Sequence, residues 1–139
     1  DRPPISSSPR VLRLGAYMRI RIDPADKVFS QYIRLRDKEC RRCHSQVQFN
    51  AKGEPITHQA SHFQGRRKEA TRFDEENVDC LCTGCHMYFT ANPGEHYQWQ
   101  VKTKGQKTVD LIILRSNTYM KKDRQMAKLY WQQRLKELN

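Results

Sequence analysis

Two cysteine pairs with the spacing Cys-x-x-Cys constrain this chain more than any other feature of its sequence. The pairs are Cys40/Cys43 and Cys82/Cys85, and the 38 residues 44–81 lie between them. Four thiolates in two such pairs are a ligand set that tetrahedral zinc prefers. The total of five cysteines is odd, which favours metal binding in a reducing compartment over a disulfide scaffold. The pattern therefore predicts a structural Zn²⁺ site that closes a long loop; reduced cysteines without metal are the alternative. Cys80 fits neither pair and is expected to be a small buried residue.

The charge of the chain favours a polyanionic partner. It has 26 Lys+Arg against 15 Asp+Glu in 139 residues, a formal charge of +11 and a pI of about 9.7. Phosphate neutralisation with release of counterions makes nucleic acid the expected partner of such a chain. A solvated basic surface is the alternative. No apolar stretch is long enough to cross a bilayer, so no membrane partner is expected.

Composition and turn signals divide the chain into three parts of an α+β protein. Residues 1–22 are expected to be a flexible tail or a basic arm, because the first ten contain three prolines and three serines. Residues 23–104 are expected to form the metal-stapled domain, and residues 105–139 a C-terminal helical extension. Only 37% of the residues are hydrophobic, so the core must be small and a metal staple would stabilise it.

Two helices carry recognisable start signals. Asp23 followed by Pro24 predicts the N-terminus of an amphipathic helix over residues 24–38. Asp123 is the expected N-cap of the last helix. Residues 108–114 form an apolar run that fits either a helix or a strand.

A hairpin is expected between the two cysteine pairs. Residues 47–57 contain two short apolar segments divided by a turn with Gly53, and His62 is expected to end the second strand. A short strand at Val78 and a helix bearing Cys85 and His86 should follow.

His62, Asn77 and His86 follow this predicted strand–loop–helix order. Phosphodiester hydrolysis needs a base to activate water and a cation to stabilise charge on the phosphorane and the leaving oxygen. One neutral histidine and one divalent metal could supply both. A single histidine is most often structural or solvated. Two histidines and an asparagine in this order, framed by the cysteine pairs, favour a functional site.

This arrangement resembles the HNH, or ββα-metal, endonuclease family. The resemblance implies that His62 is the general base, that His86 is a ligand of a catalytic Mg²⁺ or Mn²⁺, and that Asn77 holds the loop by hydrogen bonds. The family usually places an acidic residue or histidine just before the base, whereas this chain has Ser61, a poor ligand for a hard cation. His58, four residues before His62, is expected to compensate from the same face of the strand.

A closer similarity extends over residues 24–138. Phe29 to Asp37, Ala60 to Phe63 and Arg72 to Asp74 are similar to segments of the NinG (Rap) recombination nucleases of lambda-type phages. This similarity implies an enzyme that cuts branched DNA, including Holliday junctions, in the cytoplasm of a bacterial host, and a possible homodimer with two active sites.

DNA contacts are expected from the basic loop and from the first cysteine knuckle. The candidates are Arg66, Arg67, Lys68, Arg72, Arg41 and Arg42. Such contacts would hold the phosphate backbone without reading sequence. The alternative to a metal-dependent endonuclease is a non-catalytic zinc module that binds nucleic acid.

Overall fold

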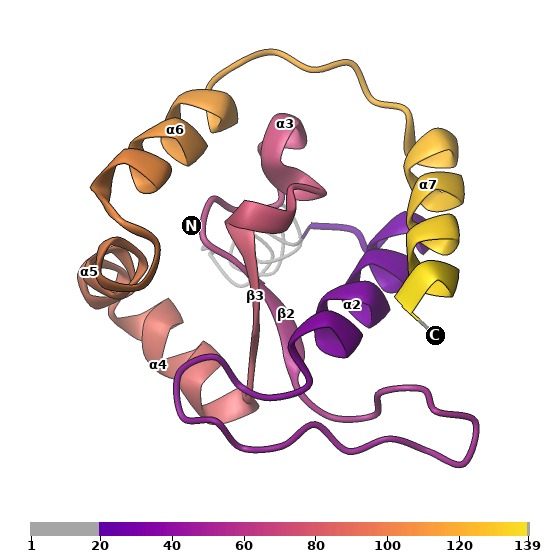
Figure 1. The fold of residues 1–139 in the computed structure, drawn as a ribbon. Coiled ribbons are helices and arrows are strands. Elements are labelled where there is room, and N and C mark those ends of the chain that lie inside the picture. The colour runs from indigo at the N-terminus through magenta and orange to yellow at the C-terminus, as the bar shows by residue number, and fades with distance from the viewer. Residues whose placement is uncertain (1–19, 139) are drawn as a thin grey trace, which may run out of the picture.

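The protein is α+β within residues 20–138, which are the residues that the computed structural model describes. Six α-helices and a two-stranded antiparallel sheet make up this range (Figure 1). The elements are α2 (Pro24–Asp37), β2 (Gln59–His62), α3 (Glu69–Arg72), the 3₁₀ turn η1 (Glu75–Asn77), β3 (Val78–Leu81), α4 (Thr83–Ala91), α5 (Pro93–Lys104), α6 (Gln106–Ser116) and α7 (Arg124–Leu138). The expected tail over residues 1–22 lies outside the described range except for its last three residues.

Helix α2 begins where the sequence predicts. The Asp23 carboxylate accepts from the Ala25 amide at 2.9 Å, and the Asp26 carboxylate accepts from the Asp23 amide at 2.7 Å. This reciprocal capping box satisfies two amides that the first turn leaves unpaired, and Pro24 occupies the first turn. The helix ends at Lys38, which adopts a left-handed conformation with φ of 62°.

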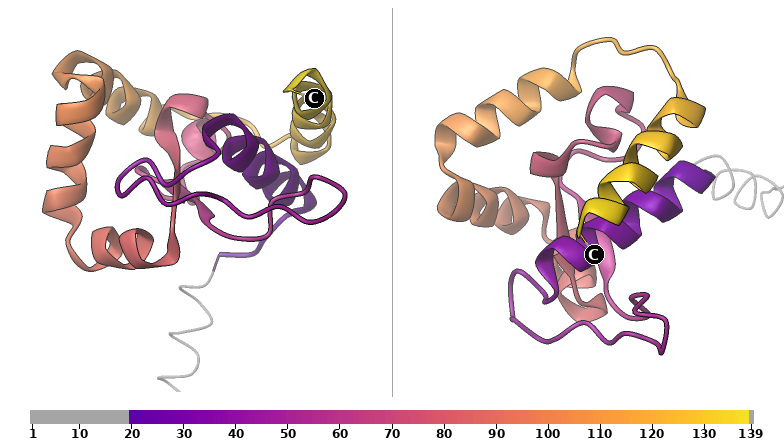
Figure 2. Two further views of the ribbon diagram at one scale, coloured as in Figure 1. Left: turned by 60° about the horizontal axis from the view of Figure 1, so that its bottom comes forward. Right: turned by 45° about the vertical axis from the view of Figure 1, so that its right-hand side comes forward.

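The sheet divides the interior into two clusters. In the register of β2 and β3, Ala60 lies opposite Cys80 and His62 opposite Val78. These residues face α2 and α7, because successive side chains of a strand point to opposite faces. Leu81 belongs to the other cluster, which contains two of the four paired cysteines. Helices α4, α5 and α6 form an arc on that side, as the views of Figure 2 show.

The expected hairpin over residues 47–57 is wrong in part. The turn is present, since the Gly53 amide donates to the Asn50 carbonyl and Gly53 has φ of 79°. Its two arms form one isolated β-bridge, between Phe49 and Pro55, and the Ile56 amide donates to the Gln48 carbonyl at 2.9 Å, but the arms do not form strands. The strand that His62 ends pairs instead with β3, which follows it in sequence.

The C-terminal extension shares the core of the rest of the protein. The run over residues 108–114 is helical and lies within α6. Asp123 caps α7 through a hydrogen bond from the Met126 amide at 3.0 Å. Trp131 of α7 is 5% exposed, and its ring lies 4.7 Å from that of Phe29 and 4.8 Å from that of Tyr32. In the described range, no helix is long and apolar enough to cross a membrane.

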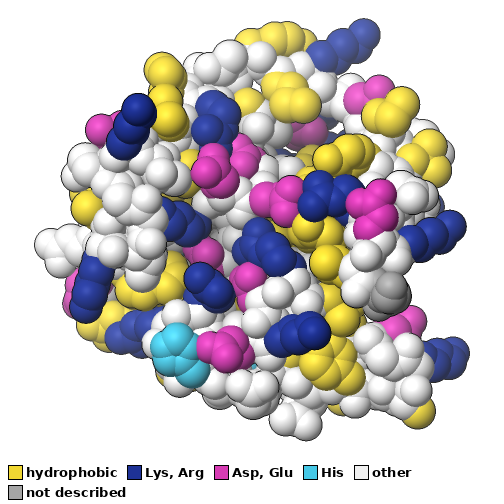
Figure 3. All heavy atoms as spheres, in the orientation of Figure 1, with side chains coloured by type: hydrophobic (Ala, Val, Ile, Leu, Met, Phe, Trp, Pro, Cys, Tyr) yellow, Lys and Arg dark blue, Asp and Glu magenta, His cyan; other side chains and the backbone are white. Residues whose placement is uncertain are grey.

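Three arginines of the extension hold the acidic segment that leads to β3. Acidic and basic side chains accordingly lie side by side on the face drawn in Figure 3. The ion pairs are Arg115 with Asp74 and Glu76, Arg124 with Glu69, and Arg134 with Glu75. They fix the segment over residues 69–77 from outside.

Candidate functional site

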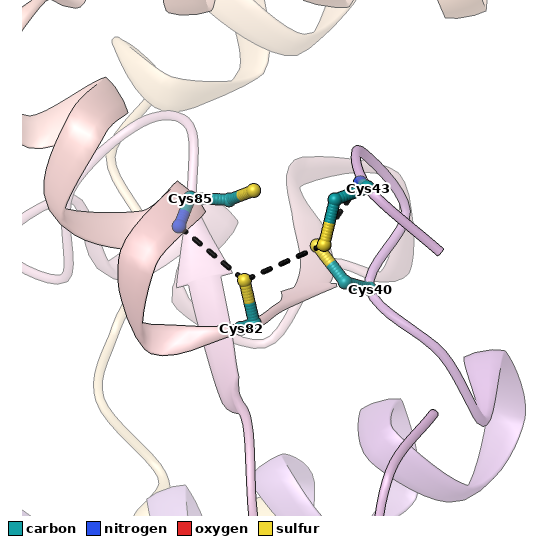
Figure 4. A group of neighbouring side chains, drawn as sticks. All are labelled: Cys40, Cys43, Cys82 and Cys85. Atoms are coloured by element: carbon teal, nitrogen blue, oxygen red, sulfur yellow. Dashed lines mark hydrogen bonds between the residues drawn. The ribbon is translucent and has the colours of Figure 1, made fainter. Parts of the chain in front are cut away.

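The four paired cysteines form a group that could hold a metal ion such as zinc. Their sulfur atoms all lie within 4.8 Å of one another, and the Sγ atoms of Cys43 and Cys82 are 3.6 Å apart (Figure 4). A tetrahedral site with Zn–S bonds of about 2.3 Å places its sulfurs about 3.8 Å apart, so the geometry fits. Cys80 is fully buried and lies outside the group, as expected.

Hydrogen bonds to the sulfurs support the thiolate form at this group. The Cys43 amide donates to Cys40 Sγ at 3.5 Å, and the Cys85 amide donates to Cys82 Sγ at 3.4 Å. Hydrogen bonds from Ser45 lower the pKa of Cys43 to about 6. Burial raises the pKa of Cys85 to about 12, although the Arg42 guanidinium donates to its sulfur at 3.5 Å. A bound cation would favour deprotonation of this last thiol as well.

A cavity of about 780 Å³ is lined by both predicted catalytic histidines. Its walls come from α2, from residues 58–66 and from α4. His62 and His86 both line it, although they are 24 positions apart in the sequence (86 − 62) and lie on different elements. His58 and Arg66 line it as well.

His62 is held in one tautomer. Its Nε2 lies 2.8 Å from the Arg72 carbonyl oxygen, which can only accept, so Nε2 carries the proton and Nδ1 keeps the lone pair. Burial lowers the pKa of His62 to about 4, so the ring is neutral near pH 7. The side chain is therefore an oriented, neutral proton acceptor.

Asn77 closes the loop between β2 and β3. It is fully buried, and its Nδ2 donates to the carbonyls of Gln64 at 2.9 Å and Thr71 at 3.0 Å. Its Oδ1 accepts from the Gln64 amide at 2.7 Å. Because Thr71 precedes Arg72, these bonds also position the carbonyl that orients His62.

His86 presents a buried nitrogen without a partner. Burial lowers the pKa of the ring, which favours its neutral form. Nδ1 is buried and accepts or donates no hydrogen bond within residues 20–138. A neutral imidazole nitrogen in this state fits the ligand role predicted for His86.

The other predicted ligands of the catalytic metal, Ser61 and His58, differ in where they lie: His58 lines the cavity with His86 and Ser61 does not. Ser61 is buried on the opposite face of β2 from His62 and lies opposite Asp79 in the register. His58 precedes the strand in a left-handed conformation with φ of 69°, so it is not on a strand face with His62. Its ring nitrogens lie 3.0 Å from the Ser45 carbonyl and 2.9 Å from the Thr57 hydroxyl. The expected placement of His58 on the strand face of His62 is therefore wrong, and both of its ring nitrogens have hydrogen-bond partners; its role as a metal ligand stays a prediction.

The basic candidates for DNA contact differ in their exposure. Arg41 and Arg67 are exposed, whereas Lys68 is half-buried and its ammonium donates to the Asn117 side chain. Arg66 borders the cavity, and Arg42 lies over the Tyr88 ring at 4.4 Å.

Arg72 is the exception among these residues. It is 3% exposed, and its guanidinium forms two hydrogen bonds with the Asp26 carboxylate. It also donates to the carbonyls of Arg21 and Arg66. A guanidinium committed in this way does not reach a phosphate, so the expected DNA contact of Arg72 is wrong and the residue is structural.

Sequence reasoning missed the α2 side of the cavity. Asp26, Lys27 and Arg34 line it, but in the sequence they are indistinguishable from the charges of any solvated helix face. Only the pairing of α2 with β2 through a shared core places them opposite the histidines.

His96 is expected to make the protein sensitive to acid. Its ring stacks on Phe89 at 4.5 Å, its Nε2 lies 3.1 Å from the Gln100 amide nitrogen, and burial lowers its pKa to about 4. Between pH 6.5 and 4 the unfolded chain binds a proton that the folded protein does not, so stability falls as the pH falls. We expect a loss of roughly 2–3 kcal/mol between pH 7 and pH 4.5 from this residue.

Urea unfolding of the parent and of His96→Phe at the two pH values checks this expectation. Lys102→Ala is the control, because Lys102 is an exposed helical residue that does not titrate between pH 4.5 and 7. The His96→Phe protein should lose less stability on acidification than the other two; equal losses in all three would contradict the role of His96.

Comparison with models of known protein families and with curated protein sequences finds no match for this chain. The resemblance to HNH and NinG nucleases therefore stays a prediction.

Proposed function

We propose that this protein is a metal-dependent DNA endonuclease of the HNH type. The observation that carries the proposal is the shared cavity of His62 and His86, in which His62 is neutral, is fixed by the Arg72 carbonyl and keeps a free lone pair on Nδ1. The order of β2, the Asn77 turn, β3 and α4 supports it, because this is the order of the ββα-metal motif. The four-cysteine group is then a structural zinc site that joins the first knuckle to α4.

His62 would start the reaction as general base. Its Nδ1 takes a proton from a water molecule placed in the cavity beside the scissile phosphate, and the resulting hydroxide attacks phosphorus. The hydrogen bond from Nε2 to the Arg72 carbonyl stabilises the imidazolium that forms, and it prevents the ring from turning. Asn77 holds that carbonyl in place through Thr71.

His86 would hold the divalent cation through Nδ1. A Mg²⁺ or Mn²⁺ ion bound there supplies positive charge for the phosphorane and the leaving oxygen. Such ions keep several water ligands and need few protein groups. Among the described residues, the four-cysteine group is the only set of three or more histidine, cysteine or acidic side chains close enough to share an ion, so the proposed cation would rely on His86 and on water ligands.

The substrate we propose is branched DNA, on the strength of the similarity to NinG nucleases and of the charge of +11. A phage or prophage origin in a bacterial host and a homodimer belong to the same proposal.

A nicking assay on supercoiled plasmid and four-way junction DNA tests the proposal. With Mg²⁺ or Mn²⁺ the parent should cut, and His62→Ala should cut about 10²–10⁴-fold more slowly, the usual contribution of a general base. Lys102→Ala is the control, since Lys102 is an exposed helical residue outside the cavity. Equal rates for parent and His62→Ala, with both proteins folded, would refute the base assignment.

A non-catalytic zinc module that binds nucleic acid is the second candidate. The observation in its favour is Ser61, which offers no carboxylate at the position where the HNH family usually has a metal ligand. Such a protein would bind DNA with strong salt dependence and leave it uncut with either metal.

A further inference from the structure

Helix α2 contributes several residues to the cavity wall, beside those of β2. Lys27, Ser30, Gln31 and Arg34 line the cavity from this helix. Ser30, Gln31 and Arg34 follow Lys27 by three, four and seven positions, so all four lie on one face of the helix. Tyr32 and Ile33 of α2 are buried in the core, and Phe29 is buried there while also lining the cavity, so the orientation of the helix is fixed by packing.

The side chains on this face of α2 differ in their hydrogen bonding. Arg34 donates to the carbonyls of Pro55 at 3.2 Å and Thr57 at 3.3 Å, so it holds the segment before β2. Lys27, Ser30 and Gln31 make no side-chain hydrogen bond or ion pair within residues 20–138. Three uncommitted donors therefore line the cavity that contains His62.

The charge of the cavity lining suits an anionic chain. Lys27, Arg34 and Arg66 are its cations, and Asp26 is its one carboxylate. The Arg72 guanidinium already neutralises Asp26, so the lining keeps an excess of positive charge. Lysine, serine and glutamine are residue types that hold DNA by its phosphates.

We propose that Lys27, Ser30 and Gln31, called here the α2 stripe, contact the phosphate backbone of the DNA strand that enters the cavity. The inference rests on the proposed function for its substrate. The α2 stripe positions the strand from one side while His62 and His86 act from the other. It adds a contact surface to the basic loop, and it reads no base sequence.

Binding of a fluorescent four-way junction, measured by anisotropy at several salt concentrations without divalent metal, tests the inference. Lys27→Ala should lower the slope of log K against log salt by about 0.9, the value for one lost phosphate contact. It should also weaken binding several-fold at low salt, and Lys27→Ala/Gln31→Ala should weaken it further. Lys102→Ala is the matched control, because Lys102 is an exposed helical lysine outside the cavity.

The same variants in the nicking assay separate this inference from the proposed function. Lys27→Ala should raise KM and leave kcat close to that of the parent, as expected when binding energy is lost equally from ground and transition states. A protein that binds DNA through Lys27 without cutting it would refute the nuclease and retain the α2 stripe. A parent that cuts, with Lys27→Ala equal to it in salt slope and KM, would refute the α2 stripe alone.

Discussion

Removal of metal from the four-cysteine group is expected to unfold a large part of the protein. Structural zinc in small zinc-finger peptides contributes apparent binding free energies of about 10–16 kcal/mol, which are also folding free energies. Here the group joins the first knuckle to the start of α4 across the inserted residues 44–81. Cys40 and Cys85 pack in one hydrophobic cluster with Leu81 and Phe89. Loss of the metal would therefore remove the bonds that hold two members of this cluster in place.

Thermal unfolding with and without a strong zinc chelator measures the effect. We expect the chelated protein to lose its cooperative transition or to melt at a much lower temperature, and added zinc to restore the transition. The measurement should be paired with the metal content of the purified protein.

Two cysteine variants sharpen this test. Cys43→Ser removes an exposed member of the group and should lower metal content and melting temperature together. Cys80→Ser changes a buried cysteine outside the group, so it should cost some packing energy but keep the response to the chelator. A parent that melts at the same temperature with and without chelator would show that the thiols pack without metal.

The local elements of the fold could be predicted because their signals are local. Asp23 and Pro24 start α2 through contacts within four residues, and Asp123 starts α7 in the same way. The sequence misled over residues 47–57, where a turn signal suggested paired strands. Of this segment only Val47 and Pro55 are buried, and the Arg34 guanidinium holds two of its carbonyls. The two arms therefore pair through a single β-bridge rather than through two strands.

In the candidate site too, features set by local sequence could be predicted and features set by distant contacts could not. The cysteine spacing predicted the cluster, because two close pairs need only one chain reversal to meet. The use of Arg72 could not be predicted, since its partner Asp26 lies 46 positions earlier and a basic run gives no sign of which member is buried. His58 was misplaced for a related reason: its alternation with His62 assumed a strand, and its left-handed backbone breaks that alternation.

Replacement of Asn77 by alanine is expected to destabilise the protein by roughly 2–4 kcal/mol. The substitution leaves the amide and the carbonyl of Gln64 without partners, and each unsatisfied buried group costs about 1–3 kcal/mol. The Thr71 carbonyl loses one donor but keeps the amides of Phe73 and Asp74, the latter at 3.2 Å. Urea unfolding compares the variant with the parent, and Gln98→Ala, which shortens an exposed amide side chain on helix α5, should change stability by no more than about 0.5 kcal/mol.

The effect of Asn77 on the site should exceed its effect on folding. Asn77 fixes Thr71, the next residue offers the carbonyl that orients His62, and His62 can accept a proton only while that bond keeps Nδ1 free. Under the proposed function, the folded fraction of Asn77→Ala should therefore nick DNA more slowly than the parent, and Asn77→Asp should do no better, since a carboxylate cannot donate to either carbonyl. A variant that is destabilised but cuts at the parent rate per folded molecule would make Asn77 a structural residue only.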